Sequence, residues 1–297
     1  MNIVNHFEHL NIVSGELLEK GWSSDTKYIL KDNHHKKYLV RLRTSDQMDK
    51  VKMEYQLMKQ CHEVGIATQK PIEYGVYGEQ SYLLLTCIEG IEASEMLPKL
   101  TNEQQYALGV QAGQYLRRIH ALPSNQKTAP WDEKFNRKID NKIRMYEQCD
   151  YKYDKGHLFL NYIENHRHLL DNRAQVPHHG DFHCGNMVIN EELKLHIIDF
   201  NRCDIGEPWE EFNRIVWCAG QSSQFASGRI DGYFDGDVPH DFWQLLLLYI
   251  STNTLSSLPW GVQFGEDQIQ LFKDQAAEIL DWYDDLNTVI PNWYCLK

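Results

Sequence analysis

The segment 178–186, HHGDFHCGN, concentrates residues that can bind a metal or move a proton. After Asn186, two β-prone runs (MVI and KLHII) flank a polar turn and lead to Asp199, which predicts a hairpin. With the turn centred just after Glu192, Asn186 lies opposite Asp199. An amide oxygen and a carboxylate are hard ligands that suit Mg²⁺.

Phosphoryl transfer needs such a pair together with one further carboxylate. That carboxylate orients the attacking hydroxyl and accepts its proton, while an Asn and an Asp hold Mg²⁺ on the nucleotide phosphates. Asp181 precedes Asn186 on the same loop and can act as this base. A zinc site is the alternative, because His179 and His183 have i, i+4 spacing. That pair converges only on a helix, which Gly180 and its neighbours disfavour.

These motifs resemble the aminoglycoside phosphotransferase and choline kinase family, whose members are small-molecule relatives of protein kinases. The matching residues are His179-x-Asp181, Asn186, Ile198-Asp199-Phe200 and Gly206-Glu207-Pro208. The resemblance implies that Asp181 is the catalytic base and that Asn186 and Asp199 bind Mg²⁺. It also assigns support of the catalytic loop to three residues, which are His179, Glu211 (where the family usually has Asp) and His120 in the motif LRRIHAL.

The same resemblance places the nucleotide in the first ninety residues. KGWSSD (20–25) lies where the phosphate-covering loop belongs, so its backbone N–H groups would approach phosphate oxygens. SYLLLTCIEG (81–90) resembles the strand that leads into the adenine-binding segment. The expected phosphate-loop residues are Gly21, Ser23 and Ser24, and the expected adenine contacts are Thr86, Cys87 and Ile88.

The Lys that contacts the nucleotide phosphates in the family is missing from its usual strand. Arg41 aligns best with it, and Lys37 begins the strand. Arg can bind phosphate as a fork but is not equivalent to Lys. Glu54, on the next predicted helix, is the candidate partner of Arg41, and the alternative is an exposed Arg with a solvated Glu. Asn201 stands where protein kinases have Gly, which argues against a protein substrate.

The pattern of apolar residues predicts two domains. Residues 26–30 and 38–42 read as a strand hairpin, 45–63 as a helix and 81–88 as a buried strand. Helices dominate beyond Gly90, with candidates at 108–122, 157–170, 242–251 and 267–286. We therefore expect an α+β, two-lobed protein-kinase-like fold, with a small β-rich N-lobe (1–89) and a larger, mainly helical C-lobe (90–297).

Composition narrows the class of protein. The chain is 42% hydrophobic, which predicts a globular protein, and its charge of −12 argues against nucleic acid as a partner. Seven scattered cysteines without a CxxC pair indicate a reducing, cytoplasmic setting. We see neither a signal peptide nor a run that would cross a membrane, and we expect a monomer or homodimer.

The negative charge is uneven. From Asp204 onward there are 15 acidic and 4 basic residues, against 27 and 26 before it. This surplus is either a solvated surface or a cleft for a cationic ligand. The candidate acceptor-binding carboxylates are Asp204, Glu207, Glu210, Asp231 and Asp235, and interleaved aromatic residues would suit an ammonium group.

The sequence therefore predicts Mg²⁺-dependent transfer of the γ-phosphoryl group of ATP or GTP to a hydroxyl of a small, cationic acceptor. It is most like an aminoglycoside O-phosphotransferase, an enzyme of antibiotic resistance. Two alternatives stay open. One is a choline, ethanolamine, homoserine or sugar kinase of the same fold, and the other is a nucleotide-binding relative without catalysis.

Overall fold

The computed structural model describes residues 3–19 and 25–294, and the chain forms two compact units. Unit 1 comprises residues 1–93 and 185–203, and unit 2 comprises residues 94–184 and 204–297. Among the described residues, no helix is both long and apolar enough to cross a membrane.

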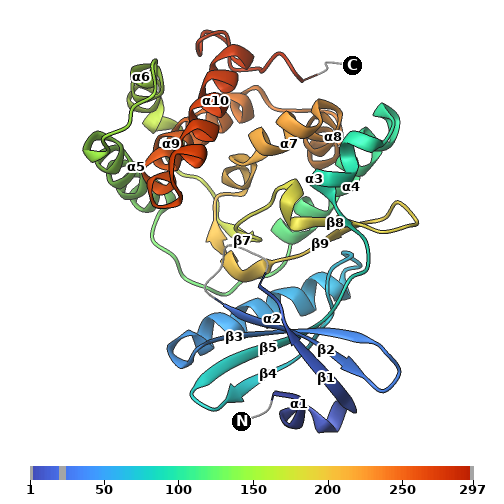
Figure 1. The fold of residues 1–297 in the computed structure, drawn as a ribbon. Coiled ribbons are helices and arrows are strands. Elements are labelled where there is room, and N and C mark those ends of the chain that lie inside the picture. Colours follow the sequence, from blue (N-terminus) through green and yellow to red (C-terminus); the bar gives the residue numbers. More distant parts are fainter. Residues whose placement is uncertain (1–2, 20–24, 295–297) are drawn as a thin grey trace. The chain divides into compact units, whose positions relative to one another are not determined.

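Unit 1 is built on a five-stranded antiparallel sheet in the order β1-β2-β3-β5-β4 (Figure 1). The strands are β1 (Ile12–Leu17), β2 (Thr26–Asp32), β3 (Lys37–Thr44), β4 (Pro71–Tyr77) and β5 (Gln80–Thr86), and the helices are α1 (Ile3–His6) and α2 (Met48–Glu63). The predicted hairpin and helix of this region are confirmed.

The side chains of β3 alternate between the two faces of this sheet, and the two sets differ in polarity. Tyr38, Val40 and Leu42 point to one face and join a hydrophobic core with α1. Because successive side chains of a strand point to opposite faces, Arg41 and Arg43 share the other face, where α2 packs.

Residues 185–203, which we expected in the C-lobe, belong to unit 1. Strand β8 (Met187–Ile189) pairs with β9 (Leu195–Ile197) and also with β6 (Ile91–Glu92). The Ile197 N–H donates to Ala67 O at 2.8 Å. These backbone hydrogen bonds attach the hairpin to the first unit.

The register of this hairpin differs from our prediction by one residue. Met187 pairs with Ile197, so Asn186 lies opposite Ile198, whose N–H donates to Asn186 O at 3.0 Å. The turn is a three-residue loop in which Leu193 is left-handed (φ 55°), rather than an even turn centred after Glu192. Asn186 and Asp199 are therefore not cross-strand partners.

Unit 2 is mainly helical. Its helices are α4 (Asn102–His120), α5 (Trp131–Gln148), α6 (Gly156–His166), α7 (Ile215–Gln221), α8 (Ser223–Phe234), α9 (His240–Gly261) and α10 (Glu266–Trp282), and α3 (Ala93–Met96) begins at the unit boundary. Strands β7 (Val176–His178) and β10 (Asp204–Gly206) form a short antiparallel sheet. The helix α4 starts six residues earlier than predicted, because Thr101 and Gln104 form a capping box.

In unit 2, α4 packs against α8 (Figure 1). The two helices meet at four glycines. The glycines are Gly109 and Gly113 on α4 and Gly228 and Gly232 on α8. A Cβ atom at any of them would lie closer than 3.0 Å to backbone atoms of the opposite helix. This close approach sets the position of α8, which carries side chains that support the site described below.

Substitution of Gly113 by Ala should destabilise the protein by about 3 kcal/mol, because the new methyl group meets the Arg229 carbonyl and the backbone must move. Urea denaturation measures the change. Gly220→Ala is the control, since a Cβ atom there meets nothing nearer than Glu278 Oε2 at 3.7 Å. Equal free energies of unfolding for the two variants would contradict the close crossing.

Candidate active site

Of the segment 178–186, His178 ends β7, residues 179–183 form a loop, and Cys184–Asn186 form a 3-10 turn before β8. Gly180 has φ +86°, a conformation that glycine adopts freely, and residues 179–183 are not helical. The two histidines of the zinc alternative therefore lack the helix that would bring them together. The Asp181 N–H donates to His179 Nδ1 at 3.2 Å, which closes the turn around the predicted base.

The buried carboxylate of Glu211 holds this loop. Its Oε2 accepts the His179 N–H and its Oε1 accepts the Gly180 N–H, each at 2.7 Å. The ring of His120 lies between Glu211 and Tyr233, with Nε2 3.3 Å from Glu211 Oε2 and Nδ1 2.8 Å from the Tyr233 hydroxyl. The three predicted support residues are therefore in contact.

The charges around Glu211 stabilise its ionised form. Burial would raise the pKa of Glu211, but the charge of His178 and the hydrogen bond to His120 bring it down to about 2. Burial also opposes the charge of His178, yet Glu211, Asp204 and Glu210 raise its pKa to about 9. Burial lowers the pKa of His120 to about 4. Glu211 is thus an ionised, buried carboxylate near a charged His178 and a neutral His120, and the ion pairs of His178 are with Asp204 at 3.5 Å and Glu210 at 4.0 Å.

The atoms of His120, His178 and Glu211 are near enough to one another to hold a metal ion. Each side chain already has partners in the protein. His178 Nε2 lies 2.9 Å from Glu207 O, and the other two bond as described above. We therefore assign this cluster to positioning of the loop.

Arg214 lies beside the predicted base and was not among the predicted site residues. Its Nε lies 2.6 Å from Asp181 Oδ1, and His183 Nε2 lies 3.5 Å from the same oxygen. Burial lowers the pKa of His183 to about 4, so His183 is neutral and Arg214 is the cation at Asp181. Its position three residues after Glu211, in EEFNR, is the only available signal.

In unit 1, Arg41 and Asp199 form a direct ion pair. Asp199 is left-handed (φ 64°) at the end of the β8–β9 hairpin, and Arg41 NH1 lies 2.5 Å from its Oδ1. The other side of the same guanidinium faces Asp25, whose Oδ2 is 2.9 Å from Nε and 2.8 Å from NH2. Arg41 is buried, so it is not the exposed strand residue of the alternative reading.

Glu54 lies closer to Arg43 than to Arg41, its expected partner. Glu54 Oε2 lies 2.7 Å from Arg43 Nη1, whereas Glu54 Oε1 lies 3.8 Å from Arg41 Nη1, and Glu54 is fully buried. Arg43 also donates to Asp25 at 2.9 Å. Because Arg41 and Arg43 share one face of β3, the carboxylates of Glu54 and Asp25 contact both guanidiniums. The prediction considered Arg41 alone and therefore missed Arg43 and Asp25.

Lys27 is a third cation on this face. It stands directly opposite Arg41 in the β2–β3 register, and such residues point to the same side of a sheet. Burial and then the charge of Arg41 lower the pKa of Lys27, while Asp199 and Asp25 raise it. Within the described part of the chain, no carboxylate lies within ion-pair distance of its ammonium.

Most of the polar backbone groups at the predicted adenine contacts serve the protein itself. Thr86 donates its N–H to Lys70 O and accepts Gln69 Nε2 at its carbonyl, and the Cys87 N–H donates to Lys37 O. Ile88 comes next, and the described residues offer no hydrogen bond to its backbone. The predicted phosphate-loop positions Gly21, Ser23 and Ser24 lie outside the described residues.

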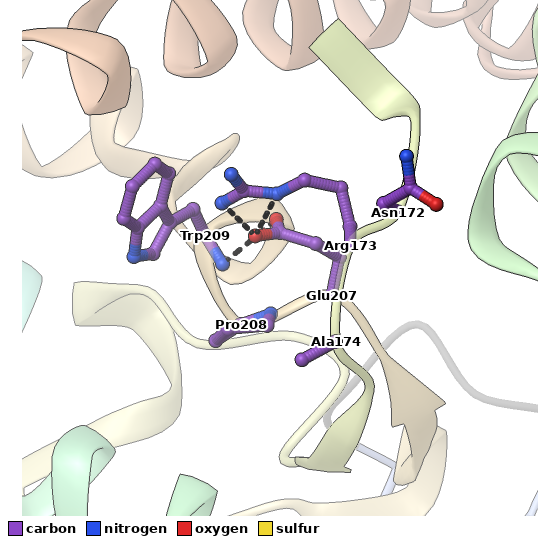
Figure 2. Close-up of a pocket in the computed structure, with 6 residues that line it drawn as sticks. All are labelled: Asn172, Arg173, Ala174, Glu207, Pro208 and Trp209. Atoms are coloured by element: carbon purple, nitrogen blue, oxygen red, sulfur yellow. Dashed lines mark hydrogen bonds and ion pairs between the residues drawn. The ribbon is translucent and has the colours of Figure 1, made fainter.

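Glu207, a predicted acceptor-binding residue, is fully buried. Figure 2 shows the Arg173 guanidinium beside the Trp209 ring and bonded to the Glu207 carboxylate. The three residues help to line a cavity of about 290 Å³. Arg173 NH2 donates to Glu207 Oε1 at 2.6 Å, and Tyr249 donates to Oε2 at 3.0 Å. Glu207 thus stabilises the fold locally, and a role in acceptor binding stays a prediction.

The other predicted acceptor-binding carboxylates also have partners in the protein. Asp204 lies 3.5 Å from His178 Nδ1, Glu210 lies 2.8 Å from Lys138 Nζ, Asp231 accepts Tyr106 and Tyr294 at 2.6 Å each, and Asp235 pairs with Arg117. These carboxylates therefore have partners within unit 2, and cationic character of the acceptor stays a prediction.

Comparison with known structures identifies the fold. At 14% identity, the amicoumacin kinase hAmiN, solved with AMP-PNP, Ca²⁺ and Ami, has a TM-score of 0.65, covering 97% of this chain and 94% of its own. A mutant aminoglycoside phosphotransferase APH(4)-Ia with ADP and hygromycin B has 12% identity and a TM-score of 0.68 over 94% of this chain and 97% of its own. A mutant aminoglycoside 2′-phosphotransferase-IIIa with GDP has 15% identity and a TM-score of 0.70 over 93% and 95%.

Residues 14–243 match the phosphotransferase enzyme family, APH, and the chain belongs to this family. The predictions of a two-lobed kinase-like fold and of a phosphotransferase enzyme are confirmed. No curated protein matches the chain in sequence.

The ion pair of His178 predicts how stability depends on pH. The pKa of His178 is about 9 in the folded protein, above the value of about 6.5 in unfolded chains. Protonated His178 therefore contributes about 3 kcal/mol to the free energy of unfolding. This contribution is complete below pH 6.5 and is lost as the pH rises through 9. Urea denaturation at pH 6 and 9.5 should show this loss, and His178→Gln should reduce it. An equal loss in both proteins would contradict the assignment.

Proposed function

We propose that this enzyme transfers the γ-phosphoryl group of ATP or GTP, with Mg²⁺, to a hydroxyl of a small acceptor, in the manner of an aminoglycoside phosphotransferase. The observation that carries the proposal is the loop of Asp181, whose backbone is fixed by the buried Glu211. Similar structures hold ADP and GDP, which supports a purine nucleotide as donor.

Asn186 and Asp199 suit Mg²⁺ as ligands. Both offer hard oxygen atoms, and Asp199 is partly exposed, with 31% of its side chain accessible. Arg41 binds Oδ1 of Asp199, and a carboxylate has two oxygens, so one carboxylate would be able to bind both a guanidinium and a metal ion. When bound, Mg²⁺ would neutralise charge on the β and γ phosphates.

Asp181 would orient the acceptor hydroxyl and take its proton. The acceptor oxygen forms a bond to the γ phosphorus, and the bond from that phosphorus to the β-phosphate oxygen breaks, leaving ADP or GDP. The ion pair of Arg214 with Asp181 Oδ1 would hold the Asp181 carboxylate in one orientation, so that it faces the acceptor hydroxyl. Catalysis then rests on positioning and charge stabilisation.

Lys27 would contact a nucleotide phosphate in place of the missing strand Lys. Arg41 is buried and engaged by Asp25 and Asp199, whereas Lys27 is half-buried and has no carboxylate partner among the described residues. A flexible ammonium on the same face can approach a phosphate without breaking an ion pair.

Asp181→Asn should lower turnover by about 10²–10⁴-fold, because the amide cannot accept the proton. Binding of Mg-ATP, measured by calorimetry, should stay within about threefold of wild type. Near-normal release of ADP with a phosphorylated acceptor would show that another group is the base.

Asp199→Ala should abolish Mg²⁺-dependent nucleotide binding. Asp199→Asn keeps an acceptor for Arg41 and so separates loss of the metal from loss of the fold. Asp49→Ala, at an exposed carboxylate of α2, is the control. Titrations with and without Mg²⁺ that do not differ from wild type would contradict the metal assignment.

Lys27→Met should weaken Mg-ATP binding at least about tenfold, the effect of losing one charged hydrogen bond. Lys31→Met is matched, since Lys31 follows Lys27 on the same face of β2 and pairs with the exposed Glu16. If the two variants bind Mg-ATP equally well, Lys27 does not contact the nucleotide.

A further inference from the structure

Unit 2 carries an ammonium group without a counterion. Lys142 lies on α5, and its Nζ donates to the amide oxygen of Asn253 at 3.4 Å. Burial lowers the pKa of Lys142 to about 7, and the charges of Lys138 and Arg214 act in the same direction. No carboxylate of the described residues lies within ion-pair distance of this ammonium.

The neighbouring acidic group does not neutralise Lys142. Glu210 is the carboxylate that acts on it, and Glu210 lies 2.8 Å from Lys138 Nζ and 4.0 Å from His178 Nδ1. Its charge is therefore shared among several cations. A partly buried cation in this state gains free energy when an anion binds.

The charge of Arg214 acts on Lys142, and its terminal nitrogens have hydrogen-bonding capacity that the described residues do not use. Its Nε faces Asp181 Oδ1, and 27% of its side chain is accessible. The described residues offer no partner to its two terminal nitrogens. A guanidinium held at Nε presents these nitrogens in a fixed plane, which matches two oxygens of a carboxylate.

We propose that the acceptor carries a carboxylate close to its reacting hydroxyl, and that Arg214 and Lys142 bind this carboxylate. The proposal rests on the proposed function, since it names the acceptor class for that reaction. A carboxylate bound to the terminal nitrogens of Arg214 would lie close to Asp181. A hydroxy acid with few bonds between its carboxylate and its hydroxyl would therefore place the hydroxyl at the base. The acceptor would then be anionic or zwitterionic at this end, and not purely cationic as its acidic surroundings suggested.

Pairs of alcohols that differ at the carboxylate provide the test. The pairs are L-serine and ethanolamine, L-homoserine and 3-amino-1-propanol, and D-gluconate and D-sorbitol, with hygromycin B as a polycationic alcohol. Binding is measured as the rise in melting temperature of the full chain with Mg²⁺ and AMP-PNP, and turnover as ADP release from Mg-ATP.

In at least one pair, we expect the carboxylate compound to stabilise the protein and to have a kcat/KM at least about tenfold above that of its partner. Lys142→Met should raise the KM for that compound by a similar factor, with a smaller effect on kcat, because Lys142 does not touch Asp181. Arg214→Gln should also weaken binding. Arg137→Gln removes an exposed positive charge from the same helix and should change neither quantity.

The proposal is overturned if no carboxylate compound stabilises the protein, if the partners without carboxylate bind as well, or if Lys142→Met keeps the preference. ADP release with hygromycin B or an amino alcohol alone would refute the acceptor class and leave the proposed kinase intact. Carboxylate binding that depends on Lys142, without ADP release that depends on Asp181, would instead refute the kinase reaction.

Discussion

One buried carboxylate, that of Glu211, fixes the backbone of the catalytic loop. Two adjacent N–H groups of the loop donate to it, so neither can rotate without leaving a buried charge unsatisfied. The rest of unit 2 keeps this carboxylate in place. The glycine crossing of α4 and α8 positions His120, and the buried Arg229 of α8 donates to Glu211 O at 2.9 Å while stacking on two phenylalanine rings.

Unit 1 is organised by charge in a similar way. Asp25, Glu54 and Asp199 face the two buried guanidiniums of β3, and Lys27 brings the number of cations to that of the carboxylates. Buried charges are costly unless each has a partner, so the cluster constrains the strand, the helix α2 and the hairpin end together. In this cluster Arg41 stabilises the fold through its ion pairs. Lys27 has no ion pair with the described residues, so we propose that Lys27, and not Arg41, contacts a phosphate.

Local patterns in the sequence predicted the elements whose structure depends on residues close together in the chain. The β2–β3 hairpin, α2 and the order of the motifs followed from alternation, helical spacing and resemblance. The register of the β8–β9 hairpin did not, because a left-handed Leu193 has no signal comparable to glycine. The helix α8 was missed, since it is buried on nearly all sides and carries two glycines that only its partner helix explains. The pairing of the acidic residues likewise depends on cations distant in sequence, such as Arg173 and Lys138.

The central claim is that this chain moves a phosphoryl group from a nucleotide to an alcohol. Incubation of the full chain with Mg²⁺, ATP labelled with ¹⁸O on the γ-phosphoryl group, and the alcohols named above tests it directly by mass spectrometry. We expect a phosphate monoester of one alcohol that carries the labelled oxygens on phosphorus and an unlabelled bridging oxygen from the alcohol. Labelled inorganic phosphate alone, or unconsumed ATP with every alcohol, would contradict the claim.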